Sequence, residues 1–225
     1  MYRNFDGQDS NFSGYGGIED ITKYVSAKYG AWWMESQNAC IPGIPSFKQS
    51  ELEENANNCT LASITRIMKY YSNIGYVNIP VDINKIYKKV REIGVKHGYH
   101  PKKSGLFRDL FIYTPWEIDN MVRDTWKEFG YTEGSGNNVY LRKLSIIKSN
   151  IDNFNPLLLN ITFGDYEGHT VSVIGYKVFS GGNKKSITFV QIFDGWSNTI
   201  RYIDWKGLGM TPASVTFFMP PKYNF

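Results

Sequence analysis

The spacing of apolar residues changes along the chain, from helix-like in the middle to strand-like near the end. Directly after Asn57 and Asn58, apolar side chains recur along one helical face at Leu61, Ile64, Met68 and Tyr71. Asn is a favoured residue just before a helix. The pattern therefore predicts a helix that begins at Cys59, with Arg66 and Lys69 on or near its other side.

Other segments repeat these two patterns. Helical spacing predicts further helices over 18–29, 81–93, 115–129 and 141–153, and β-branched or apolar runs predict strands over 157–163, 199–204 and 214–219. Helices come first and antiparallel strands come last, which is typical of an α+β fold.

Two strand-like runs, 169–179 and 186–194, flank Gly181 and Gly182. Strands joined through a Gly-Gly pair are typical of a β-hairpin with a tight turn. If the two glycines form the turn, Ser180 pairs with Asn183, and that pair sets the register of both strands.

In this register His169, which opens the first strand, lies opposite Asp194, which ends the second. Side chains directly opposite each other on one face are close neighbours. The same register pairs apolar residues on that face, Val171 with Ile192 and Val173 with Val190. A slip of one residue would move Asp194 to the other face.

Cys59, His169 and Asp194 together suggest nucleophilic chemistry. A helix N-terminus and a neighbouring imidazolium both stabilise a thiolate, and an acid beside the histidine orients it. Each residue also has an ordinary explanation: a free cysteine is often a small buried hydrophobe, a histidine often a core residue, and an Asp before Gly195 often a turn former. Their combination favours a cysteine nucleophile with a histidine base and an orienting acid.

These residues resemble papain-fold cysteine peptidases, nearest the bacteriocin-processing group that cleaves double-glycine leaders. The resemblance runs from Ile44 to the C-terminus through short motifs: Ile44–Gln49, the Cys59 helix, Asn155–Ile161, Gly168–Val171 and Asp194–Trp196. It implies a helical half that carries the cysteine and an antiparallel sheet that carries the histidine and the acid. It also implies hydrolysis of peptide bonds through a thioester, with no cofactor and no metal.

The resemblance assigns two supporting roles. Gln49 would help to form the oxyanion hole, and Trp196 would shield the hydrogen bond between the acid and His169. The chain departs from the family in the insertion Ser50–Asn58, which must loop out if Gln49 is to act; otherwise Asn57 or Asn58 supplies the donor. Cys59 is also followed by Thr60 and Leu61, where relatives commonly have Gly.

Length and composition fit this hypothesis. The chain has 225 residues, enough for one domain that buries about 70% of its unfolded surface. We expect an N-terminal arm over 1–43 and a peptidase domain over 44–225. The net charge of +4 is modest and no basic cluster is present, which argues against a nucleic-acid binder. Two cysteines are too few for a disulfide framework, and Cys40, with no helix start after it, is the poorer nucleophile.

The predicted activity is that of a cysteine endopeptidase acting on a peptide or protein, as a monomer. A transamidase would use the same residues, and an inactive papain-fold module would bind peptide or cell-wall material instead. No apolar run is long enough to span a membrane, and the first residues have no apolar signal core. The family favours export with a leader removed, and a cytoplasmic location is the alternative.

Overall fold

The computed structural model describes residues 17–54, 56–99, 115–140, 143–161, 168–182, 185–208 and 213–222. The helices are α1 (Ile21–Tyr29), α2 (Cys59–Asn73), α3 (Ile83–Lys96), α5 (Ile118–Glu128) and α6 (Leu144–Asp152), with short 3₁₀ turns η1 (Gln49–Glu51) and η2 (Pro115–Glu117). The strands are β1 (Met34–Cys40), β2 (Ser135–Val139), β3 (Leu157–Ile161), β4 (His169–Ser180), β5 (Ser186–Phe193), β6 (Arg201–Asp204) and β7 (Ala213–Met219).

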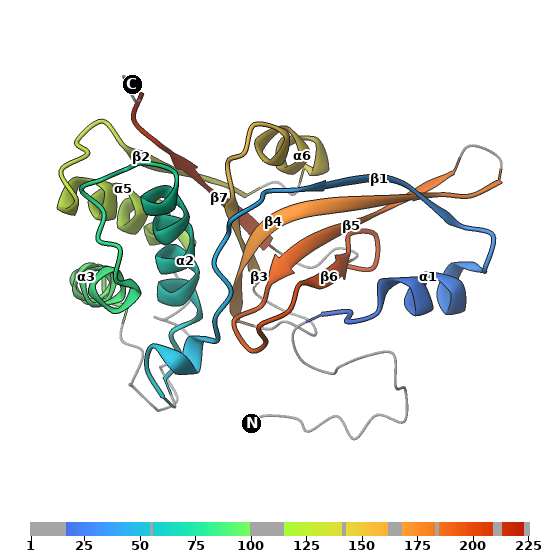
Figure 1. Ribbon diagram of the computed structural model, residues 1–225, viewed down its shortest axis with the longest axis horizontal. Helices are drawn as coiled ribbons and strands as arrows, with labels where there is room; N and C mark the ends of the chain where they lie inside the picture. Colours follow the sequence, from blue (N-terminus) through green and yellow to red (C-terminus); the bar gives the residue numbers. More distant parts are fainter. Residues whose placement is uncertain are drawn as a thin grey trace.

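The strands form one antiparallel sheet in the order β2-β7-β3-β4-β5-β6, and β1 also pairs with β4. Figure 1 shows α2, α3 and α5 gathered at one end of the molecule, with the β4–β5 hairpin extending towards the other. Helix α2 lies between α3 and the sheet, in contact with both α3 and β4. The predicted α+β class is confirmed.

The β4–β5 hairpin is present, but its predicted register is wrong. Ser180 pairs with Ser186 and not with Asn183, so five residues separate the strand ends where a two-residue turn was expected. The register of β4 and β5 shifts again between Val173 and Gly175. On the side of this shift nearer His169, Val173 lies opposite Ile192. The face-to-face pairing predicted for His169 and Asp194 is therefore absent, and Asp194 follows the end of β5.

Strand β4 belongs to two parts of the sheet. Its first residues, from His169 to Val173, pair with β3, whereas Gly175 to Ser180 pair with β1. The partner changes at the point where the register with β5 shifts. One continuous strand therefore connects the start of β4, where His169 lies, to the part of the sheet in which β4 pairs with β1.

Helix α2 begins at Cys59 as predicted, but it is buried on all sides. Leu61, Ile64 and Met68 are in the main hydrophobic core, and Arg66, which was expected near a polar face, has no exposed surface. The helix packs between sheet and helices, so its second face also contacts protein. A single apolar stripe cannot reveal such a position, because polar residues on the remaining face can be satisfied by internal partners.

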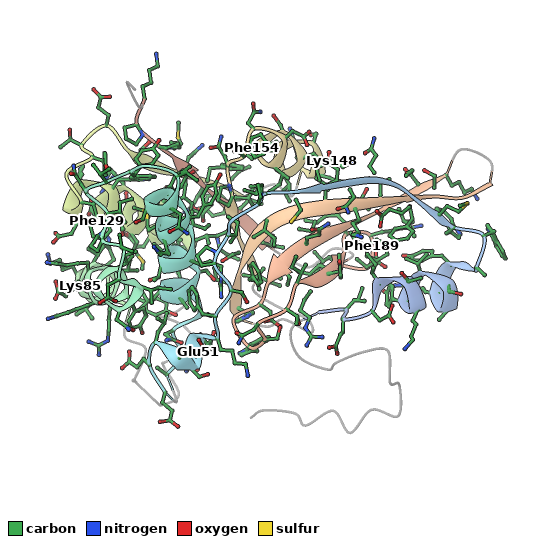
Figure 2. The ribbon with its side chains drawn as sticks, in the orientation of Figure 1. Glu51, Lys85, Phe129, Lys148, Phe154 and Phe189 are labelled. Carbon is green, nitrogen blue, oxygen red and sulfur yellow. The ribbon has the colours of Figure 1, made fainter. Side chains whose placement is uncertain are left out.

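The described part of the predicted N-terminal arm packs against the hairpin. Tyr24 of α1 meets Phe189 of β5 edge to face, at 5.8 Å between ring centroids. Figure 2 shows Phe189 on the hairpin, above α1. The Asp204 carboxylate accepts hydrogen bonds from Tyr24, Tyr29 and Lys28 at 3.1, 2.6 and 2.9 Å. Strand β1 was not predicted, and the division of the chain at residue 43 stays a prediction.

No helix among the described residues has both the length and the apolar character needed to cross a membrane.

Candidate active site

Cys59 is the first residue of α2, and its side chain is 7% exposed. Asn58 precedes it, as predicted, but the Asn58 side chain does not cap the helix. Its Nδ2 instead donates to the Gln49 carbonyl and to the Tyr87 hydroxyl, both at 3.1 Å. Asn58 thereby joins η1 and α3 to the start of the helix that carries the thiol.

His169 opens β4 directly after Gly168, whose φ of 64° lies in the left-handed region. Its Nε2 lies 2.7 Å from the main-chain carbonyl oxygen of Asp194. A carbonyl oxygen only accepts, so Nε2 must carry the hydrogen in this contact. Nδ1 is then the ring nitrogen left for the thiol of Cys59.

Trp196 stacks flat on the His169 ring, with 3.7 Å between centroids and 8° between planes. The contact covers one face of the imidazole and fixes its plane. The resemblance placed Trp196 beside this histidine, and the structure brings the two rings together. The ring thus has both a fixed hydrogen-bond acceptor and a fixed stacking partner.

The Asp194 carboxylate does not make the predicted contact with His169. Its Oδ1 accepts hydrogen bonds from the backbone N–H of Trp196 and of Ser197, each at 2.9 Å, and from the Ser197 hydroxyl at 3.1 Å. This is a local side-chain turn of the kind Asp commonly forms. The residue orients the histidine through its main chain, and its side chain shapes the turn that carries Trp196.

The environment of Cys59 lowers the pKa of its thiol to about 7. Burial acts to raise that pKa, because it disfavours the anion. The hydrogen bond and charge of His169 outweigh burial, with further hydrogen bonds from the Thr170 backbone and the Tyr99 hydroxyl. By contrast, burial raises the pKa of Cys40, whose thiol lies on β1. Of the two thiols, Cys59 is the one prepared to ionise near neutral pH.

Gln49 lies against the turn that follows Asp194. Its backbone N–H donates to the Gly195 carbonyl at 2.7 Å, and its Oε1 lies 2.9 Å from the place where a Cβ on Gly195 would sit. Any side chain at residue 195 would therefore displace Gln49, and the φ of 80° there also favours glycine. Oε1 is buried and accepts no hydrogen bond from the described residues.

Glu53, in the insertion between Gln49 and Cys59, contacts α3. The Glu53 carboxylate accepts hydrogen bonds from Tyr87 at 2.8 Å and from Arg91 at 3.1 Å. Figure 2 shows Glu51 at the end of the molecule where α2 begins. The chain thus returns to Asn58 with Gln49 held close to the site. Its role as oxyanion donor, and the alternative through Asn57 or Asn58, stay predictions.

Arg66 was not predicted to support the site. Its guanidinium donates to the carbonyl oxygens of Pro45 and Phe47, at 3.2 and 2.7 Å, and to the Ser172 hydroxyl at 3.1 Å. Its carbon Cζ lies over the rings of Phe47 and Phe193, at 4.3 and 5.2 Å. Burial lowers the pKa of Arg66 to about 10, while the charges of Asp194 and Glu51 favour the cation.

Arg66 therefore joins the segments that hold the other site residues. Pro45 and Phe47 lead into Gln49, Ser172 shares β4 with His169, and Phe193 precedes Asp194. The only sequence signal for a role of Arg66 was that it is a lone arginine in a helix without acidic residues. The spacing of apolar residues alone predicted that it lies near solvent.

A buried chain of polar side chains runs behind the site. Thr60 contacts Thr170 at 2.9 Å, and Thr170 donates to Asn160 at 3.0 Å. Asn160 donates onward to Ser214 at 3.2 Å and to Thr216 at 2.9 Å. These hydrogen-bonded side chains extend from α2 through β4 and β3 to β7, so they hold the helix of Cys59 against the strand of His169.

Among the described residues, no three His, Cys, Asp or Glu side chains gather as they would around a metal ion. His97 lies between Glu117 and Asp124, but the two acids contact opposite ring nitrogens, Nδ1 at 2.9 Å and Nε2 at 3.0 Å, so the three side chains do not face one common point. His100 lies outside the described residues.

Comparison with known proteins identifies the family. The Peptidase_C39 like family matches residues 41–208, most of the chain. The chain belongs to this family. It is thus a member of the papain-like cysteine peptidases and has their fold, with the thiol on the helical half and the histidine on the sheet, as the resemblance implied.

The comparison with curated proteins found no match. Among solved structures, the chain is similar to the crystal structure of SERA5E from Plasmodium falciparum, with 14% identity and a TM-score of 0.42. That likeness covers 84% of this chain and 95% of the other. At this level of similarity we draw no conclusion from it.

Proposed function

We propose that this family member is an active peptidase that hydrolyses peptide bonds through a thioester on Cys59, with His169 as the base. The observation that carries the proposal is a helix-start thiol whose pKa is lowered by His169, a histidine whose ring is held by the Asp194 carbonyl and by Trp196. A nucleophile, an adjacent base and a group that orients the base are the arrangement that acyl transfer needs.

In the first step the thiol proton passes to Nδ1 of His169, and the thiolate attacks the peptide carbonyl carbon. The imidazolium then gives that proton to the leaving amine, the C–N bond breaks, and a thioester remains. In the second step water attacks the thioester carbonyl carbon and gives one proton to Nδ1. The C–S bond then breaks, the acid is released, and the imidazolium returns the proton to the sulfur of Cys59. Throughout, Nε2–H stays on the Asp194 carbonyl, which keeps the ring in the required tautomer.

The negative charge that develops on the carbonyl oxygen needs donors. The proposed donors are the backbone N–H of Cys59, at the helix start, and the side-chain amide of Gln49. Gln49 is supported by its contact with Gly195, which places it beside the turn that holds His169. Asn58 supports the same region by holding the Gln49 carbonyl.

The test is alkylation with iodoacetamide across pH, with each thiol followed by mass spectrometry. The thiolate reacts, so the rate at Cys59 should reach its plateau above pH 7 and fall about tenfold per unit below it. Cys40 should react only at higher pH, because burial raises its pKa. If Cys59 reacts more slowly than Cys40 throughout, the protein is an inactive module of this fold.

Products distinguish hydrolysis from transamidation. A peptide incubated with the enzyme and a small amine should yield the free acid if water is the acceptor, and the amide if the amine is. Hydrolysis is the proposed outcome. Export of the protein with a leader removed, and action as a monomer, remain part of this proposal.

A further inference from the structure

Tyr99 lies directly beyond α3, with its hydroxyl next to the nucleophile. The side chain is buried, and the oxygen lies 4.0 Å from Sγ of Cys59. The same hydroxyl donates to the carbonyl oxygen of Asn57 at 2.8 Å. A single phenol oxygen thus lies between the thiol and the loop that leads into α2.

The end of α3 fixes the position of Tyr99. Gly98 has a φ of 82°, and the Tyr99 backbone N–H donates to the Gly94 carbonyl at 2.8 Å, which closes the helix end. A Cβ on Gly94 would lie 3.5 Å from the Tyr99 Cβ, so the two residues are in close contact. The hydroxyl therefore reaches the thiol from a rigid support.

The hydrogen bonds of this hydroxyl depend on the state of Cys59. A phenol has one proton to donate, and it can also accept. While its proton lies on the Asn57 carbonyl, it presents only lone pairs to sulfur, which suits a neutral S–H. A thiolate has no proton, so lone pairs directed at it would be repulsive. The long distance of 4.0 Å between the Tyr99 oxygen and Sγ fits a hydroxyl that donates to the Asn57 carbonyl while the thiol of Cys59 is neutral.

We propose that Tyr99 is a positioning residue for the nucleophile, whose hydroxyl turns from the Asn57 carbonyl to donate to Sγ when the thiolate forms. The proposal rests on the function proposed above for Cys59. No covalent bond to Tyr99 forms or breaks: the thiol proton goes to Nδ1 of His169, and Tyr99 keeps its own. When sulfur becomes part of the thioester, the hydroxyl returns to Asn57.

The effect on the thiol has a definite direction. A hydrogen bond donated to an anion favours the charged form and lowers the pKa of the acid. Among the described residues, the titratable side chains that act on the thiol are His169, from β4, and Tyr99, and both lower the pKa of Cys59 against the effect of burial. Losing the phenol hydroxyl should therefore raise the pH at which Cys59 reacts.

The experiment measures the pH profile of Cys59 alkylation in Tyr99→Phe, with Cys40→Ser as the background. Removing one donor should raise the midpoint by about half to one unit, which lowers the rate below the midpoint about three- to tenfold. Tyr87→Phe is the matched control, because its hydroxyl is also on the α3 segment and also contacts the loop before Cys59, through Asn58. It should keep the wild-type midpoint.

A second variant guards against loss of folding in Tyr99→Phe. Incorporation of 3-fluorotyrosine at residue 99 keeps the shape and makes the hydroxyl a stronger donor, so the midpoint should fall. A purely structural tyrosine would leave the midpoint unmoved in both cases, and that result would overturn the proposal. A wild-type midpoint at the ordinary value for a cysteine would overturn the proposed function itself.

Discussion

Because His169 contacts the main chain of Asp194, substitutions at residue 194 should have an unusually small effect on catalytic activity. Where a carboxylate orients a catalytic histidine, replacing it by the amide lowers kcat about 10⁴-fold, because the ring is held in the wrong tautomer. Here the acceptor is a carbonyl that every residue possesses. Asp194→Asn should therefore keep kcat/KM within about tenfold of wild type.

The cost of losing the side chain follows from its three hydrogen bonds. In Asp194→Ala, two backbone N–H groups, of Trp196 and Ser197, lose their acceptor. Each such loss costs about 1–3 kcal/mol, so the free energy of unfolding should fall by about 2–6 kcal/mol. Asn keeps an oxygen for both groups and loses only the charge, which should cost about 1 kcal/mol.

Chemical denaturation of both variants measures these losses, and turnover of a peptide substrate measures activity. The Asn variant should be close to wild type in both, whereas the Ala variant should lose stability and activity together as the turn loosens beneath Trp196. A different outcome would refute the reasoning: Asp194→Asn that is fully stable yet a thousandfold slower would mean that the carboxylate orients His169 during catalysis.

Three further predictions concern the other site residues. Cys59→Ala and His169→Ala should each abolish turnover and leave the melting temperature nearly unchanged; activity retained in Cys59→Ala but lost in Cys40→Ala would reassign the nucleophile. Gln49→Ala should lower kcat about 10²–10³-fold while Cys59 still alkylates at the wild-type rate, since an oxyanion donor acts only on the transition state. If Gln49→Ala turns over substrate normally and Asn58→Ala does not, the donor lies in the loop before Cys59. Arg66→Met should cost about 3 kcal/mol or more in chemical denaturation, because it leaves several buried oxygens without a donor, and Arg66→Lys should cost less; a Met variant as stable as wild type would show that these contacts contribute little.

Local patterns predicted much of the fold. Every predicted helix is present in the described residues within a few positions, and α2 begins at Cys59 as its spacing and Asn58 indicated. The two strands that were missed, β1 and β2, are short of β-branched residues. Met34–Cys40 is largely exposed, and Ser135–Val139 contains Gly and Asn, which disfavour strands. Pairing with β4 and β7 holds them in place, and that information lies elsewhere in the chain.

The site was partly predictable for the same reason. Residue type pointed to Cys59 and His169 as candidates, and the resemblance pointed to Trp196, whose ring stacks on the imidazole of His169. The roles of these residues stay predictions. The orienting contact was assigned to the wrong atom of Asp194, because the hairpin register depended on a turn of two residues and the actual connection is longer. Tyr99 and Arg66 reach the site only through tertiary packing, and neither lies in a motif.

The two-part pairing of β4 has a consequence for any attempt to shorten the protein. A chain that began at residue 44 would lose β1, leaving the backbone of Gly175 to Ser180 as an open edge. It would also lose α1, which covers Phe179, Ile187 and Phe189. An open strand edge beside bare aromatic surface is a template for self-association. The segment before the family match therefore protects the hairpin against aggregation, although it supplies none of the proposed catalytic residues.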